Sequence, residues 1–183
     1  MIEISNAELA LLSILGEKPR HAYDLEKVIE DRNIRNWTDL GFSSIYRILT
    51  NLEKKGLLKG KITPPEGRGP ARKVYQLTEK GKFAWQKSVL SHLANPDRKY
   101  SSFLLALDNL ARIPKEDALF ALKKYLNDQI EINTYLSSSF SDHPMKDDFY
   151  IQAFFSYILE QQKSEIDWLR SFIEIFEKHT SGV

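Results

Sequence analysis

Cysteine is absent from the 183 residues. The chain therefore has no disulfide framework, no thiolate metal site and no cysteine nucleophile. Long apolar runs are missing as well. The first apolar run, LALLSIL, is too short to span a membrane, and acidic Glu3 and Glu8 precede it where a signal peptide carries positive charge. We expect a cytoplasmic protein with no membrane partner.

Clusters of metal-ligating or catalytic side chains are also missing. The four histidines are scattered without the paired spacing of a metal site: His21, His92, His143 and His179. The segment SDHPMKDD, residues 141–148, holds His143 and three acids, Asp142, Asp147 and Asp148. A turn followed by a helix cap explains these acids better than a metal or catalytic site does. No nucleophile elbow, P-loop or dinucleotide fingerprint occurs. We expect no enzyme, no cofactor and no metal.

Net charge is nearly absent, because 26 Lys and Arg stand against 25 Asp and Glu. The distribution is uneven, however. Residues 1–90 hold 16 basic and 11 acidic residues, net +5, which leaves 10 and 14, net −4, for residues 91–183. We expect the two halves to have different roles.

Apolar spacing and capping residues predict three helices in the first third of the chain: 6–15, 21–31 and 45–55. Ser5 and Glu8 have capping-box spacing at the first. Ser43 or Ser44 is a good N-cap for the third, and Gly56 is a suitable residue to end it.

Two short alternating stretches, 57–63 and 73–77, flank a loop of proline, glycine and arginine and predict a β-hairpin. Thr78 can cap a further helix that runs to about Leu93, before Asn95 and Pro96 interrupt the chain. The order predicts a mainly α protein, with a winged helix-turn-helix DNA-binding domain and its β-hairpin wing in residues 1–95 and a helical dimerisation domain in residues 96–183.

The second domain reads as helical segments at 101–113, from Pro114 to Leu136, and from Asp147 to Lys178, with a loop after Leu136. The last helix is about 45 Å long, more than a small domain needs to cover itself. We therefore predict dimerisation through its apolar stripe: Phe154, Ile158, Leu169, Ile173 and Phe176.

The third helix has one apolar face, and the opposite face carries residues that reach base edges and phosphates: Ser43, Arg47, Thr50, Asn51 and Lys54. The hairpin loop adds three cations, Arg68, Arg72 and Lys73, which suit the minor groove or the phosphates beside it. Each feature taken singly also fits a solvated surface, since polar helix faces and charged loops are common.

Three motifs together resemble the PadR family of bacterial transcriptional regulators. They are HAYDL at 21–25, with Ala22 where the family has glycine, SSIYRILTNLEKKGLL at 43–58 and GRGPARKVYQLTEKG at 67–81. The resemblance implies a homodimer, most simply a repressor, whose two winged domains bind a pseudo-palindromic operator. It places Ser44 and the start of the third helix in the major groove, Tyr46 near the phosphates and Arg68 at the minor groove.

Some members of that family release DNA when a small aromatic acid binds. Three aromatic residues near the domain junction are candidates for such an effector site: Trp85, Tyr100 and Phe103. The alternative is a winged-helix protein-interaction module without DNA binding. Gathering Arg47, Lys54, Arg68 and Arg72 on one surface favours DNA.

Overall fold

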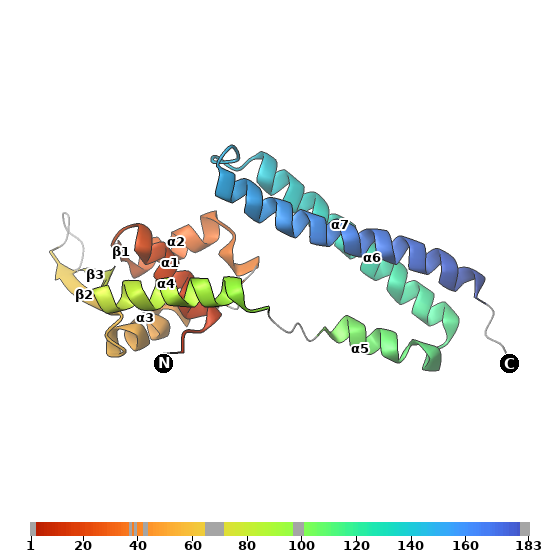
Figure 1. Ribbon diagram of the computed structural model, residues 1–183, viewed down its shortest axis with the longest axis horizontal. Coiled ribbons are helices and arrows are strands. Elements are labelled where there is room, and N and C mark those ends of the chain that lie inside the picture. Colours follow the sequence, from red (N-terminus) through yellow and green to blue (C-terminus); the bar gives the residue numbers. More distant parts are fainter. Residues whose placement is uncertain are drawn as a thin grey trace. The chain divides into compact units, whose positions relative to one another are not determined.

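The computed structural model describes residues 3–36, 38, 40–41, 44–64, 72–96 and 101–179. The chain divides into two compact units, residues 1–98 and 99–183 (Figure 1). The first unit is built from α1 (Asn6–Glu17), β1 (Arg20–His21), α2 (Ala22–Asp31), the 3₁₀ turn η1 (Ile34–Asn36), α3 (Ile45–Lys54), β2 (Leu58–Thr63), β3 (Arg72–Leu77) and α4 (Glu79–Ala94).

The predicted capping box starts α1. The Ser5 hydroxyl accepts from the Glu8 amide at 3.2 Å, and the Glu8 carboxylate accepts from the Ser5 amide at 3.1 Å. The helix expected over residues 6–15 ends two residues later than predicted, at Glu17. Among the described glycines only Gly56 has a positive φ, so Gly16 keeps a helical backbone and the helix continues to Glu17.

The sheet has three antiparallel strands in the order β1, β3, β2. β2 and β3 form the predicted hairpin, with Leu58 opposite Leu77 and Thr63 opposite Arg72. β1 adds Arg20 and His21 to the free edge of β3. The sequence did not predict this strand, because two residues are too few to show alternation.

The core of the first unit lies among the three helices and the sheet, and its fully buried members include Leu11, Leu12, Leu25, Ile29, Leu49, Leu52 and Leu57. Gly56 ends α3 in the left-handed region at φ 71°, as predicted. At the start of α4 the Thr78 hydroxyl accepts from the Gly81 amide at 2.9 Å. A Cβ on Gly81 would lie 2.0 Å from the Leu57 carbonyl oxygen, which explains the Thr-x-x-Gly sequence there.

The second unit contains α5 (Ser102–Asp108), the 3₁₀ turn η3 (Leu110–Arg112), α6 (Lys115–Ser141) and α7 (Phe149–Lys178). The helix expected over 101–113 is divided at Asn109, and Pro114 is the N-cap of α6 rather than its first helical residue.

The expected end of α6 at Leu136 is wrong, because the helix runs on to Ser141. The hydroxyls of Ser137 and Ser141 donate back to carbonyls one turn earlier, at 2.8 and 3.0 Å. Serine hydroxyls bonded in this way fit within a helix. Phe140 also contacts Phe155 of α7, with ring centroids 5.0 Å apart.

Helices α6 and α7 lie side by side as an antiparallel pair (Figure 1). Lys115 at the start of α6 donates to the carbonyls of Glu177 and His179 at the end of α7, at 2.9 and 2.7 Å. Leu122, Leu169 and Ile173 form the small buried core between the helices.

Candidate nucleic-acid interface

The exposed face of α3 carries the predicted polar residues. Burial of Ile45, Ile48, Leu49 and Leu52 fixes the rotation of the helix. The opposite side is exposed at Arg47, Thr50, Asn51 and Lys54, and the Tyr46 side chain is 65% exposed. Arg47 and Lys54 make no ion pair with any residue of the described ranges. Both charges are therefore available to a ligand.

Two hydroxyls of this helix are engaged within the chain. Ser44 occupies the N-cap position, but its hydroxyl donates to the Gly41 carbonyl at 2.6 Å and does not cap the helix. The Thr50 hydroxyl donates to the Tyr46 carbonyl at 2.9 Å. Each hydroxyl uses its hydrogen within the chain, and its oxygen can still accept a hydrogen bond. Both are therefore better suited to accept from a base amino group than to donate to a base oxygen. Ser43 lies outside the described residues.

Glu53 joins α3 to the wing. Its carboxylate accepts from the Gly60 amide of β2 at 3.1 Å and from the Lys73 ammonium of β3 at 2.6 Å. The hydrogen bond from Lys73 holds the pKa of Glu53 below its ordinary value, and the same bond raises the pKa of Lys73. Lys73, predicted as a DNA contact, therefore already has an internal partner, and it positions the wing beside α3.

A cleft of about 360 Å³ opens between the start of α2, the start of α3 and strand β3. Its lining combines aromatic and cationic side chains: His21, Ala22, Tyr23, Tyr46, Arg72, Lys73 and Tyr75. Tyr23 is 73% exposed. At the start of α2 the His21 amide donates to the Asp24 carboxylate at 3.4 Å, so the positive charge of the cleft comes from Arg72 and Lys73.

His21 and Tyr23 line this cleft, although neither was predicted from the sequence as a site residue. The His21 ring nitrogen Nδ1 lies 3.3 Å from the Lys73 carbonyl, which ties the start of α2 to the wing strand. Both residues belong to the HAYDL motif, so the motif itself was the signal that could have identified them.

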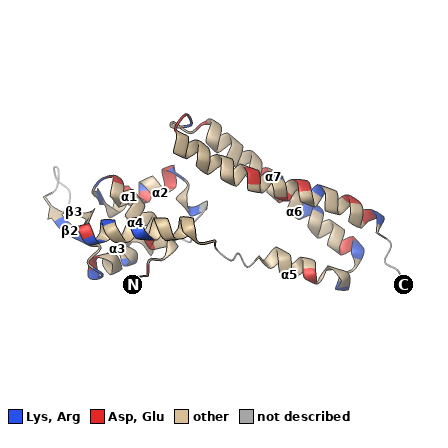
Figure 2. Cartoon of the chain, viewed as in Figure 1, with Lys and Arg blue, Asp and Glu red and all other residues tan. Residues whose placement is uncertain are grey.

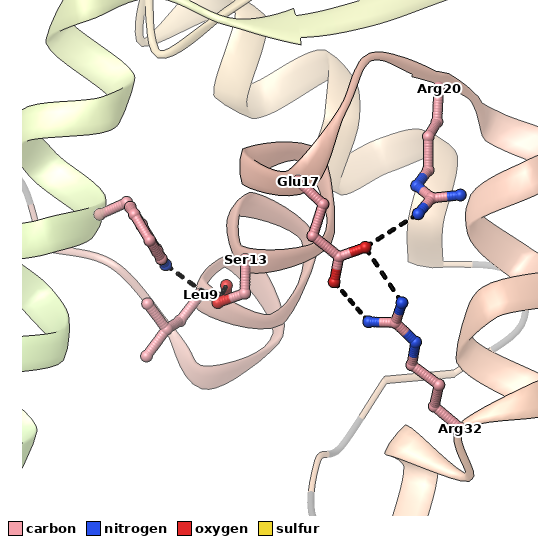
Figure 3. Close-up of polar contacts among 6 residues, drawn as sticks. Leu9, Ser13, Glu17, Arg20 and Arg32 are labelled. Atoms are coloured by element: carbon pink, nitrogen blue, oxygen red, sulfur yellow. Dashed lines mark hydrogen bonds and ion pairs between the residues drawn. The ribbon is translucent and has the colours of Figure 1, made fainter. Parts of the chain in front are cut away.

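Other arginines of the first unit serve the fold (Figure 3). The Glu17 carboxylate accepts from Arg20 at 2.9 Å and forms a two-pronged pair with Arg32. The hydrogen bond from Arg32 holds the pKa of Glu17 below its ordinary value and raises the pKa of Arg32. Figure 2 shows further Lys and Arg residues on the hairpin and α3, where the polar face lies.

Predicted residues at the wing tip and the domain junction have mixed outcomes. Arg72 is exposed on β3, whereas Arg68 and Tyr100 lie outside the described residues. The Trp85 indole belongs to the first unit and donates to the Ser13 hydroxyl at 3.0 Å. Ser13 in turn donates to the Leu9 carbonyl at 2.9 Å (Figure 3). Trp85 therefore ties α4 to α1. Phe103 belongs to the second unit and lines a cleft there.

The predicted dimerisation stripe of α7 is largely used within the chain. Leu169 and Ile173 are buried against α6 and α5, with exposed fractions of 0% and 6%, and Ile158 and Phe176 are half-buried. Only Phe154 of the five is substantially exposed, at 41%. Leu169 and Ile173 therefore define an inner face of α7, which is buried against the same chain.

A second apolar face of α7 is exposed instead. We call it the outer stripe: Tyr150, Phe154, Tyr157, Trp168 and Ile175. Along α7 they belong to a row of positions spaced alternately by four and three residues, which share one side of the helix. The other positions of this row hold polar residues, Gln161, Ser164 and Ser171. The outer stripe is rotated by about 100° around the helix from the inner face. Hydrophobic periodicity alone did not separate the two faces.

In the part of the chain that the structure describes, no three His, Asp or Glu side chains are placed to hold a metal ion. Nor does any helix among the described residues have the length and hydropathy to cross a membrane.

Residues 11–87 match the model of the Transcriptional regulator PadR-like family. The chain is 23% identical over 177 residues to the Negative transcriptional regulator PadR of Bacillus subtilis (strain 168), with 92% of this chain and 96% of the relative covered. The family is one of transcriptional regulators, which agrees with the expectation that the chain is no enzyme.

Two crystal structures of Bacillus subtilis PadR share the fold. The complex with p-coumaric acid has a TM-score of 0.76 at 19% identity, covering 93% of this chain and 98% of that one. The complex with operator DNA has a TM-score of 0.74 at 19% identity, covering 92% and 98%. The match confirms the mainly helical fold with a winged-helix N-terminus.

Proposed function

From the premise that residues 11–87 form a domain of the PadR-like family, we propose that this protein is a homodimeric, DNA-binding transcriptional repressor of the cytoplasm, under small-molecule control. The observation that carries the proposal is the exposed face of α3, where Arg47 and Lys54 form no ion pair with any described residue, beside the cationic cleft at β3.

In the proposed complex α3 enters the major groove. Its exposed face is narrow and polar. Arginine can form two hydrogen bonds with a guanine edge and asparagine two with an adenine edge, so Arg47 and Asn51 suit base recognition. Burial of the opposite face against the core of the first unit holds the helix rigid. A rigid support keeps side chains in position for base contacts.

The cleft at the start of α2 is proposed to hold a backbone phosphate. Tyr23 and Tyr46 offer hydroxyls, and Arg72 offers a guanidinium. The Glu53 bridge fixes the wing against α3, so that groove and phosphate contacts share one register. Strand cations Lys59 and Lys61 add exposed positive charge on β2.

Dimerisation is proposed through the outer stripe of α7. Tyr150 is 77% exposed, Tyr157 63% and Ile175 67%, and large apolar side chains in one exposed row mark an association surface. A two-fold dimer would present two α3 helices to half-sites about 34 Å apart. The repressor role is carried over from the name of the Bacillus subtilis relative, and effector control from the p-coumaric acid complex.

Selection of binding sites from random duplex DNA tests the proposal. We expect enrichment of a pseudo-palindromic sequence. A plot of the logarithm of the binding constant against the logarithm of the salt concentration should fall with a slope of about −0.9 for each phosphate that the protein neutralises. Recovery of no sequence, together with a flat salt response, would instead support a protein-interaction module.

A further inference from the structure

Glu53 is the only acidic residue of α3, β2 and β3, the elements that carry most of the proposed DNA contacts. The same three elements hold six basic residues: Arg47, Lys54, Lys59, Lys61, Arg72 and Lys73. The Glu53 side chain is 32% exposed, so its charge is not hidden in the core. A carboxylate near DNA phosphates repels them, so Glu53 lowers affinity unless its charge is compensated.

Two donors hold the Glu53 carboxylate. Its Oε1 atom accepts from the Gly60 amide at 3.1 Å, and its Oε2 atom accepts from the Lys73 ammonium at 2.6 Å. The Lys73 ammonium also lies 5.2 Å from the centroid of the Tyr75 ring, a cation–π contact with a buried tyrosine. Lys73 is therefore held both by the carboxylate and by the aromatic ring.

The space that the pair occupies depends on Gly60. A Cβ at this position would lie 2.0 Å from the Lys73 Cε atom and 2.8 Å from the Glu53 Oε1 atom, so any side chain there would displace the pair. The residue that donates to the carboxylate thus also leaves room for the pair. An ion pair between two flexible surface side chains has no such support from the backbone.

The other cations of these elements are not compensated in this way. None of Arg47, Lys54, Lys59, Lys61 and Arg72 forms an ion pair with a described residue. Within α3, β2 and β3, Lys73 alone is paired with an acid of the described ranges. Five cations are therefore free to neutralise phosphates, while the sixth first has to leave Glu53.

We propose that Glu53 limits binding to non-specific DNA, because it keeps Lys73 from contacting phosphates. Non-specific complexes consist of phosphate contacts, so one cation fewer weakens them. The same pair holds the wing against α3 before DNA binds, and this order favours the operator, on which the wing has one required position. Glu53 is thus a positioning residue that acts through Lys73. The inference rests on the DNA binding proposed above and adds a source of its selectivity.

Glu53→Gln in the full chain tests the inference by freeing Lys73. The glutamine oxygen can still accept from Gly60, while the charge that holds Lys73 is lost. For non-specific duplex DNA, we expect the log–log salt slope to steepen by about 0.9 and binding at 0.1 M salt to become about eightfold tighter, because one more phosphate is neutralised. The operator should gain less, so that its preference over non-specific DNA falls by about three- to tenfold.

Two further variants separate the pair from a general effect of charge. Glu30→Gln removes an exposed acid of α2 that forms no ion pair with a described residue, and it should change the slope much less. The double variant Glu53→Gln/Lys73→Met exchanges the ion pair for two neutral side chains. Its slope should therefore return to that of the unmodified chain, whereas a merely structural role of Glu53 would not link the slope to Lys73.

An unchanged slope in Glu53→Gln, or a steeper slope that persists in the double variant, would overturn the inference. The same measurements separate it from the proposed function. A flat salt response of the unmodified chain would contradict DNA binding itself, and this inference with it. A salt-dependent response that Glu53→Gln does not alter contradicts the role of Glu53 alone.

Discussion

The two units of the chain use their apolar residues differently. Of the ten largest fully buried side chains among the described residues, nine lie in the first unit and only Leu169 lies in the second. Both units expose some large apolar side chains, but the second exposes more of them, along α6 and α7, including Phe120, Tyr135 and Tyr157. A unit that covers its own core can fold alone, whereas exposed rows of aromatic side chains favour association, which is the role proposed for the second unit.

This difference also separates recognition from assembly. In the first unit the polar face of α3 is exposed because its apolar face is fully used. In the second unit one apolar face of α7 is used by α6 and the other is not. The proposed DNA contacts and the proposed dimer contacts therefore lie on separate units, and variants should affect one without the other.

Removal of the second unit should have the largest effect. A fragment of residues 1–96 keeps the complete core of the first unit and loses the outer stripe. We expect a folded monomer whose operator affinity is about 10²–10⁴-fold weaker, because binding of the second half-site is no longer intramolecular. Circular dichroism, light scattering and gel shifts measure fold, mass and affinity. A fragment that dimerises as the full chain does would place the interface in the first unit.

Leu169→Ala distinguishes the inner face of α7 from the outer stripe. Leu169 is fully buried, so we expect its truncation to lower the free energy of unfolding by about 2–5 kcal/mol. Ile175→Ala, on the outer stripe of the same helix, should weaken dimerisation and change the folding of the single chain little. Urea unfolding at several protein concentrations measures both. If Leu169→Ala dissociated the dimer without loss of folding stability, the inner face would be the interface after all.

Arg47→Ala should weaken operator binding by about 1–3 kcal/mol and relax the preferred sequence, because an arginine at the groove contributes base contacts. The dimer mass should not change. Lys87→Ala, which removes an exposed cation of α4, is the control and should alter affinity little. Gel shifts with the selected operator measure the affinity, and gel shifts with its single-base variants measure the sequence preference. A uniform loss over all sequences would make Arg47 a phosphate contact instead.

The Glu17 pair gives the smallest effect. The pKa of Glu17 is lowered in the folded state, so its stabilising contribution is present above the unfolded pKa, about 4.3, and is lost as pH falls through the lower folded value. Because the Glu17 and Arg32 side chains are 42% and 48% exposed, water screens their pair, and we expect Glu17→Gln to cost less than about 1 kcal/mol at pH 7 and still less near pH 3. Urea unfolding at both pH values measures the difference. A cost that grows towards low pH would contradict the assigned role.

The first unit was more predictable from sequence than the second. Its helices carry local signals, such as the Ser5 box and Gly56, and its α3 face followed from helical spacing. The Glu53 bridge was not predictable, because it joins residues distant in the chain. In the second unit, apolar residues cover two faces of α7, and only contacts with α6 show which face remains exposed. The extension of α6 beyond Leu136 was also not predictable, because a serine-rich segment is typical of a loop. Only the structure shows that the hydroxyls of Ser137 and Ser141 donate to carbonyls within the helix.

The central claim is that the outer stripe of α7 makes the dimer, and one substitution tests it most directly. Tyr157→Glu places a charge on the stripe, while Ser156→Glu places the same charge on an exposed neighbour outside it. Light scattering should report a dimer for the unmodified chain and for Ser156→Glu, and a folded monomer for Tyr157→Glu. A Tyr157→Glu protein that remains dimeric over the same concentrations would contradict the claim.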